Sequence, residues 1–255
     1  MEPILNVQGL DKSFGSVVAA ADINVAVARD EIVGIIGANG AGKTTFVNMV
    51  TGYIRPSRGT IRFSDRDITG LPPRSIINAG ISRSFQVPQL FATATAFDNV
   101  LIALGIAQDG RFPVWRPLRR ADLVESATQI LERFGIGGHR DQLAGKVSQG
   151  VRKLIDIAMA TVHRPQLLLL DEPTSGVSVE EKFAIMDVVV AALREQKVTI
   201  LFVEHDMEIV ARFATRLLAF YEGTIVADDV PQRVIADPQV RRFIIGERYR
   251  HGAHA

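Results

Sequence analysis

The chain has 255 residues, of which 47% are hydrophobic, and it contains no cysteine. Its 29 Lys and Arg nearly balance its 28 Asp and Glu, giving a formal net charge of +1. This composition supports a buried core without disulfides or thiolate metal sites, and it gives no global charge for wrapping nucleic acid or lying on an anionic membrane.

Two further patterns concern location. The start, Met-Glu-Pro, lacks the charged-then-apolar pattern of a secretion signal. No window reaches the roughly 18 consecutive apolar residues that a membrane-spanning helix needs. We therefore expect a protein of the reducing cytoplasm, whose membrane role, if it has one, depends on a partner.

The opening of the chain reads as β-rich. Apolar and β-branched residues predict strands at 4–7, 23–27 and 31–36, with turn residues between them. A glycine-rich turn follows the third strand, and a short helix is predicted at 43–51. This stretch is therefore a strand, loop and helix unit.

The middle of the chain changes to helix-forming segments. Helices are predicted at 96–105 and 119–134, separated by a loop at 110–117 that contains Pro and Arg. We interpret the region of about 90–162 as a helical subdomain inserted in a nucleotide-binding core.

The core then resumes with helices alternating with strands. Helices are predicted at 151–162 and 179–194, and strands at 167–170 and 198–203. This alternation predicts a mostly parallel sheet covered by helices on both faces. Beyond it we expect a helix from Asp206, two short strands around Glu222 and Gly223, a helix at 238–244 and a flexible tail at 249–255.

A phosphate-binding loop is the strongest local motif. Residues 37–44 fit G-x-x-x-x-G-K-[ST] and lie directly between a buried strand and a helix, a context that disfavours a chance glycine-rich turn. We expect Lys43 to reach the β- and γ-phosphates of ATP and Thr44 to hold Mg²⁺. The predicted ATP-binding residues are Gly37, Ala38, Asn39, Gly40, Ala41, Gly42, Lys43, Thr44 and Thr45.

Two carboxylates follow the strand of four leucines at 167–170. An α/β sheet presents ligand groups at the carboxyl ends of its strands, so we expect Asp171 to orient Mg²⁺ or its water. Glu172 is then the natural general base for the water that attacks the γ-phosphate. Alone, Asp-Glu would be an ordinary strand end, but the upstream phosphate loop favours the catalytic interpretation.

Four further motifs occur in the same order along the chain as in the ABC ATPases, and they resemble motifs of that family. Gln86 lies where that family has its Q-loop, and the segment from Val147 to Val151 resembles the signature sequence. The segment from Ser175 to Ser178 resembles the D-loop, and His205 lies where the family has the switch histidine. Each has a simpler alternative: a polar strand end for Gln86, a satisfied imidazole for His205, and a helix N-cap for Ser148.

The resemblance implies the following roles. Gln86 would be a metal and water ligand, Lys43 and His205 would join Glu172 in catalysis, and Phe14 would stack on adenine unless it is a core residue. The signature residues that would act on the opposite protomer are Ser148, Gln149 and Gly150, and the D-loop residues are Ser175, Gly176 and Ser178. The metal set would be Thr44, Gln86 and Asp171.

The chain also departs from the family pattern. Gln149 replaces the first glycine of the usual signature and Val151 its glutamine, while Ser178 stands where the D-loop usually has Asp. These changes put the contacts across a dimer in doubt and leave the base and Mg²⁺ residues intact. We expect hydrolysis to persist; a non-hydrolysing or asymmetric partner subunit is the alternative.

The resemblance implies an α/β, P-loop ABC-type core with a mostly parallel sheet, an N-terminal antiparallel β subdomain and an inserted helical subdomain, all in one domain at 1–248. It implies a head-to-tail dimer of ATPase subunits, homomeric or heteromeric, that encloses two ATPs and drives a membrane permease. A soluble ABC ATPase outside transport is a second alternative, disfavoured by the absence of paired cassettes, a coiled-coil insertion or basic arms.

Four segments, 85–91, 98–101, 203–207 and 243–247, are similar to the branched-chain amino acid (LIV-type) importer ATPases. That branch implies a bacterial importer of such amino acids or a related small polar solute, served by a periplasmic solute-binding protein. The ATPase would lie on the cytoplasmic face of the inner membrane, held by the permease, with no nucleic-acid partner.

Overall fold

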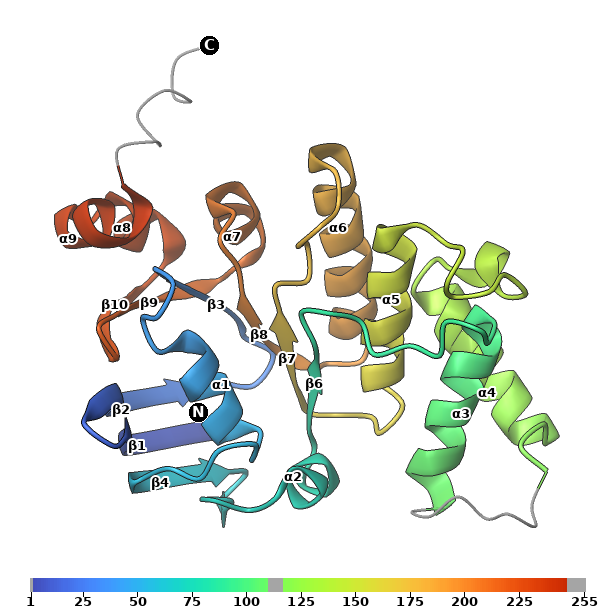
Figure 1. Cartoon of the computed structure of the whole chain (residues 1–255), viewed down its shortest axis with the longest axis horizontal. Coiled ribbons are helices and arrows are strands. Elements are labelled where there is room, and N and C mark those ends of the chain that lie inside the picture. Colours follow the sequence, from blue (N-terminus) through green and yellow to red (C-terminus); the bar gives the residue numbers. More distant parts are fainter. Residues whose placement is uncertain (1, 110–116, 247–255) are drawn as a thin grey trace. The chain divides into compact units, whose positions relative to one another are not determined.

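The computed structural model describes residues 2–109 and 117–246. The chain divides into two compact units: Met1–Ile81 with Thr199–Ala255, and Ser82–Val198 (Figure 1). The predicted tail at 249–255 and most of the predicted loop at 110–117 lie outside the described residues.

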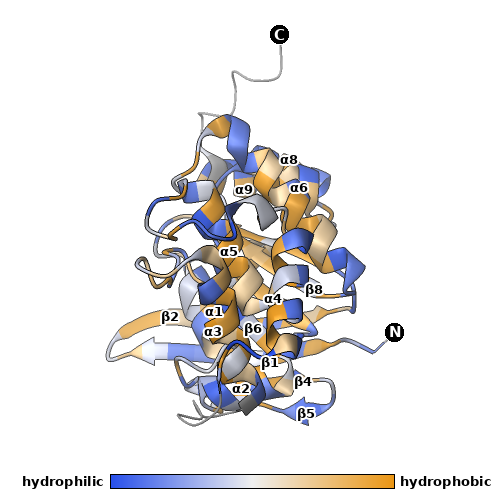
Figure 2. Cartoon of the chain, turned by 90° about the vertical axis from the view of Figure 1, so that its right-hand side faces the viewer, coloured by the Kyte–Doolittle hydropathy of each residue, from blue (hydrophilic) through white to orange (hydrophobic). Residues whose placement is uncertain are grey.

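The first unit contains an antiparallel sheet. Its strands are β1 (Leu5–Phe14), β2 (Val17–Val27), β4 (Arg58–Phe63) and β5 (Arg66–Asp67), in the order β2-β1-β4-β5. The short edge strand β5 is exposed and hydrophilic, which disfavours pairing with another chain (Figure 2). This sheet is the expected N-terminal antiparallel subdomain.

The first unit also contains strands of a second sheet. These are β3 (Ile32–Gly37), β8 (Thr199–Val203), β9 (Arg216–Tyr221) and β10 (Thr224–Asp229), in the order β10-β9-β3-β8. β3 pairs in parallel with β8 and β9, whereas β10 returns antiparallel to β9. Every residue of β3 and β8 is buried, as expected for parallel strands covered on both faces.

Six short helical elements complete the described part of this unit. They are α1 (Lys43–Val50), α2 (Pro73–Ala79), α7 (Met207–Phe213), α8 (Pro231–Ala236), α9 (Pro238–Val240) and the π-helical turn η2 (Arg241–Ile245). Proline stands in the first turn of α2, α8 and α9, where its missing N–H costs no intrahelical hydrogen bond.

The second unit contains β6 (Ile81–Ser84, whose first residue belongs to the first unit) beside β7 (Leu167–Asp171), with longer helices. The helices are α3 (Ala96–Asp109), α4 (Ala121–Arg133), α5 (Gln149–Ala160) and α6 (Val179–Glu195), with a 3-10 turn η1 (Gly137–His139). α4 buries Leu123, Ala127, Ile130 and Leu131, one stripe at helical spacing, and carries hydrophilic residues on its other side (Figure 2).

The structure corrects several predicted boundaries. The predicted strand at 4–7 extends to Phe14 because bulges after Val7 carry it past Gly9, which has a φ of +54°. The predicted helix at 151–162 begins at Gln149, and the one at 238–244 is split between α9 and η2. Strands β4 and β5 and helix α2 were not predicted.

Candidate functional site

The loop between β3 and α1 is shaped by backbone packing. A Cβ on Gly37 would lie 2.4 Å from the backbone oxygen of Phe220. Gly42 has a φ of +99°, and a Cβ there would lie 2.6 Å from the backbone oxygen of Ala19. Neither position accepts a side chain, so these two glycines are required by the close approach of neighbouring strands.

Lys43 is the first residue of α1 and is 6% exposed. Its Nζ donates hydrogen bonds to the backbone oxygens of Gly37 at 2.6 Å and of Ala38 at 3.0 Å. The first N–H groups of a helix lack intrahelical acceptors and carry partial positive charge, so loop and helix end together favour an anion. Ala38, Asn39, Gly40 and Thr44 are exposed, Thr45 is half-buried, and Gly37, Ala41 and Gly42 are buried.

Phe14 and His205 also belong to the first unit. Phe14 ends β1 with its side chain 49% exposed, and the Nζ of Lys12 lies 4.9 Å from the centre of its ring. An aromatic ring so exposed is not a core residue. His205 follows β8 and is exposed, while Glu204 before it is buried and accepts a hydrogen bond from the His205 backbone N–H at 3.1 Å.

The second unit presents the two predicted carboxylates at the carboxyl end of β7. Asp171 is 8% exposed and forms a 2.5 Å ion pair with Arg83, which lies on the adjacent strand β6. Glu172 is partly exposed, and its Oε2 accepts a 2.6 Å hydrogen bond from Nε2 of Gln86. The structure therefore brings Gln86 and Glu172 into direct contact, beside Asp171 in the chain.

The backbone of Glu172 is unusual. Its φ is +48°, in the left-handed region that is uncommon for residues other than glycine. Such conformations cluster at functional sites and persist where the surroundings hold them. Here the backbone N–H of Ser175 donates to the Glu172 carbonyl at 3.1 Å, which closes a tight turn.

The signature segment opens α5. Ser148 is the N-cap, and its Oγ accepts a 3.3 Å hydrogen bond from the backbone N–H of Val151. A Cβ on Gly150 would lie 3.0 Å from Cδ1 of Ile185 on α6, a tight contact that the end of the isoleucine side chain would have to relieve by moving. Gln149 is exposed, and its side chain lies near the Cβ position of Gly176, at 3.8 Å.

The D-loop segment leads into α6. Ser178 is the N-cap of α6 and forms a capping box with Glu181: its Oγ accepts from the Glu181 backbone N–H at 3.3 Å, and Glu181 accepts from its backbone N–H at 3.4 Å. Ser178 therefore has a local structural role that Asp, also a good N-cap, would share.

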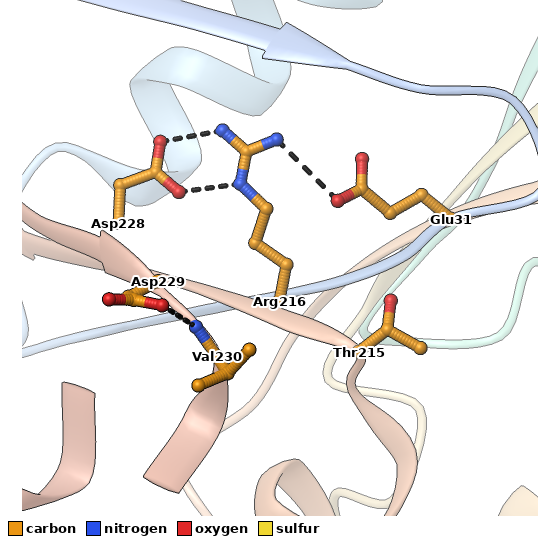
Figure 3. Close-up of a pocket in the computed structure, with 6 residues that line it drawn as sticks. All are labelled: Glu31, Thr215, Arg216, Asp228, Asp229 and Val230. Carbon is orange, nitrogen blue, oxygen red and sulfur yellow. Dashed lines mark hydrogen bonds and ion pairs between the residues drawn. The ribbon is translucent and has the colours of Figure 1, made fainter. Parts of the chain in front are cut away.

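A separate pocket of the first unit lies where β3 and β9 begin, at the opposite end of these strands from the phosphate loop (Figure 3). Arg216 donates to both carboxylate oxygens of Asp228, at 2.5 and 2.6 Å, and lies 3.5 Å from Glu31. The hydrogen bonds that Arg216 donates to Asp228 raise the pKa of the guanidinium above its usual value. Because these groups pair with one another, the pocket serves the fold.

The sequence as a whole matches known proteins. The pattern that defines the ABC transporter family matches residues 20–175. The chain belongs to the ABC transporter family. This ATPase is 34% identical to the high-affinity branched-chain amino acid transport ATP-binding protein LivG of Escherichia coli strain K12, across 96% of this chain and 99% of LivG.

Other relatives of the ATPase are similar over most of its length. It is 33% identical to BraF of Pseudomonas aeruginosa, a high-affinity branched-chain amino acid transport ATP-binding protein, over 96% of this chain and 98% of BraF. It is 31% identical to the lipopolysaccharide export system ATP-binding protein LptB of Acidithiobacillus ferridurans, over 98% of this chain and 99% of LptB.

Among solved structures, the ADP conformation of MJ1267, an ATP-binding cassette of an ABC transporter, superposes with a TM-score of 0.84 at 30% identity, covering 94% of this chain and 97% of that one. The predicted ABC-type fold and the predicted ATPase activity are thereby confirmed. In the described parts of this ATPase, none of the helices is both long and apolar enough to cross a bilayer.

Sequence reasoning missed three charged residues around the carboxylates of the ATPase: Arg83, Lys153 and Asp156. Lys153 and Asp156 lie on α5, where both are buried. The available signal was a pair of opposite charges at i and i+3 on an otherwise apolar helix face, which the sequence alone does not distinguish from a solvent-exposed pair.

Proposed function

We propose that this ATPase powers an importer of branched-chain amino acids or a related small polar solute through a separate permease. The full-length similarity to LivG and BraF supports the solute class. The hydrolytic role is supported above all by one observation: the 2.6 Å hydrogen bond between Gln86 and Glu172, at the end of the strand that carries Asp171.

In this proposal Glu172 is the general base. Its partly exposed carboxylate accepts the Gln86 amide and can accept a proton from a water molecule, which then attacks the γ-phosphate. Lys43 and the loop from Gly37 to Thr45 bind the phosphates, and Phe14 stacks on the adenine. His205 contacts the γ-phosphate from its place after β8.

Mg²⁺ would be held by oxygen ligands. Thr44, Asp171 and Gln86 supply a hydroxyl, a carboxylate and an amide oxygen, the hard ligands that Mg²⁺ prefers. The ion would neutralise charge on the β- and γ-phosphates.

The proposed assembly is a head-to-tail dimer. Ser148, Gln149 and Gly150 would contact the nucleotide of the opposite protomer, with Ser175, Gly176 and Ser178 beside them. The second protomer is either another copy or a different ATPase, and the dimer is held by the permease at the cytoplasmic face of the inner membrane. A periplasmic solute-binding protein would select the solute.

We propose one ATPase domain at 1–248, with its helical subdomain at about 90–162.

The test is ATP turnover by the wild type and by Glu172→Gln, each reconstituted with the membrane subunits encoded beside it. Removing the carboxylate base should lower turnover by about 10²- to 10⁴-fold while ATP binding is retained. Exposed Glu208→Gln, on α7, is the matched control and should turn over at the wild-type rate.

Two other results would favour a different function for the chain. Absence of turnover in the assembled wild type would show that the changes at Gln149, Val151 and Ser178 make the chain a binding or asymmetric partner subunit. The similarity to LptB favours lipopolysaccharide export as the second candidate. Turnover stimulated by lipopolysaccharide, and not by leucine with a binding protein, would favour export.

A further inference from the structure

Lys153 connects three segments of the second unit. It is 1% exposed, on α5, five residues after Ser148. Its Nζ donates to the backbone oxygen of Gln86 at 2.5 Å, to that of Glu172 at 3.0 Å and to Oγ of Ser175 at 3.1 Å. An ammonium carries three N–H donors, so these three acceptors use its full donor capacity.

These acceptors belong to the residues that the proposed chemistry uses. Gln86 and Glu172 meet through their side chains at 2.6 Å, and Lys153 holds the backbone carbonyls of the same two residues. Hydrogen bonds from a charged donor are about twice as strong as neutral ones. The pair is therefore fixed at both its side chains and its main chains.

The contact with Glu172 bears on its strained backbone. A non-glycine residue at a φ of +48° is strained and needs surrounding contacts to persist. The Glu172 carbonyl accepts from the Ser175 backbone N–H and from Lys153. Lys153 thus stabilises the turn that aims the Glu172 carboxylate.

Asp156 holds the Gln86 segment from the same helix face. It is 6% exposed and accepts from the backbone N–H of Phe85 at 3.2 Å and of Gln89 at 3.0 Å. Residues three apart on a helix are neighbours, so Lys153 and Asp156 act on the segment together. One binds a carbonyl within it, and the other binds N–H groups on either side of Gln86.

We propose that Lys153 is a positioning residue that holds Glu172 and Gln86 in their mutual geometry, with Asp156 fixing the Gln86 segment beside it. The inference rests on the proposed role of Glu172 as the base. It makes α5 the element that joins the signature segment, at its N-terminus, to the general base and the D-loop serine. A misplacement of about 1 Å at such a site can cost 10²-fold in rate.

The direct test is amide hydrogen exchange in the full chain, comparing the wild type with Lys153→Met. Met has similar length and no donor. Exchange should accelerate at 172–175 and 85–89, except at the two prolines there, which have no amide hydrogen. It should be unchanged in β3 and α1, which lie in the other unit. Lys197→Met is the control, because it removes an exposed lysine from the same unit.

The functional test is ATP turnover in the assembled transporter. For Lys153→Met we expect kcat to fall by about 10- to 100-fold with KM for ATP within about twofold, since positioning affects the chemical step. Lys153→Arg keeps donors and charge and should recover part of the lost kcat. Lys197→Met should match the wild type.

Each outcome is decisive. Unchanged exchange at 172–175 in folded Lys153→Met overturns the inference whatever the turnover shows, and so does a wild-type kcat. If Lys153→Met fails to fold, Ser175→Ala removes one acceptor: faster amide exchange at Glu172 and Thr174 supports the inference, and unchanged exchange there overturns it. Wild-type turnover by Glu172→Gln would contradict the proposed role of Glu172 as the base. The exchange result would still test separately whether Lys153 holds the backbone of Glu172 and Gln86.

Discussion

At the residue scale, the phosphate loop depends on two glycines that no other residue replaces. Gly42 combines a φ of +99° with a Cβ position 2.6 Å from a backbone oxygen, and backbone atoms cannot move aside as a flexible side chain can. The requirement is thus steric, and it is independent of any phosphate contact.

Gly42→Ala should therefore lose both stability and nucleotide affinity. Backbone strain should lower the free energy of unfolding by about 1–3 kcal/mol, and the clash should add to this loss. Urea denaturation measures the change. Gly135→Ala is the control: its φ is +66° and nothing lies within 4 Å of its Cβ position, so it tests conformation without the clash. Equal losses in the two variants would contradict the steric argument.

The buried carboxyl of Asp156 predicts a pH effect. Burial raises its pKa above the ordinary 3.8, although hydrogen bonds from Gln89 and Phe85 and the charge of Lys153 lower it in part. A carboxyl with a higher pKa in the folded state binds more protons there, so its contribution to stability decreases as pH rises through the window above 3.8.

Asp156→Asn removes this titration. The destabilisation of the variant relative to the wild type should be larger near pH 4 than near pH 7, measured by urea denaturation across that range. Asp122→Asn should show the opposite trend, because the hydrogen bond from Arg120 lowers the pKa of Asp122. A pH-independent difference for Asp156→Asn would refute the prediction.

Whether the role of such a residue can be predicted depends on how far its hydrogen-bonding partners lie from it along the sequence. Lys43 and its loop are recognisable because the motif is contiguous and follows a buried strand. Lys153 is not, because its acceptors lie 67, 19 and 22 residues away and become neighbours only in the folded unit. A buried lysine has the same local pattern as an exposed one.

At the element scale, the N-terminus of α6 depends on the capping box of Ser178 and Glu181. Ser178→Ala should lower the free energy of unfolding by about 1 kcal/mol, and Ser178→Asp should leave it nearly unchanged, because Asp caps equally well. Urea denaturation of both variants checks this. An alanine variant as stable as the wild type would show that the cap contributes nothing.

The elements missed by the sequence were those with weak patterns. β4 contains Gly59 and two arginines, and it buries just two side chains. Its pairing with β1 in the antiparallel sheet, and not its own propensity, makes it a strand. The fully buried strands β3, β7 and β8 were predictable because each is a mostly apolar run of five or six residues, too short for a typical helix.

At the scale of the whole molecule, one chain carries one set of motifs, so the proposed function requires pairing. Glu172→Gln with ATP should shift from a 27.9 kDa species to twice that mass in sedimentation velocity. If the functional dimer is heteromeric, the shift should appear only when the second ATPase subunit is added. No association in either mixture would contradict the head-to-tail dimer.

The contacts of Lys43 have a consequence for how a nucleotide would enter. Its ammonium is already held by two carbonyls of its own loop, so the loop is shaped by the chain itself. An arriving phosphate would exchange neutral oxygen acceptors for charged ones and would have no disordered segment to order. Nucleotide binding should then avoid much of the conformational entropy cost of ordering a flexible loop.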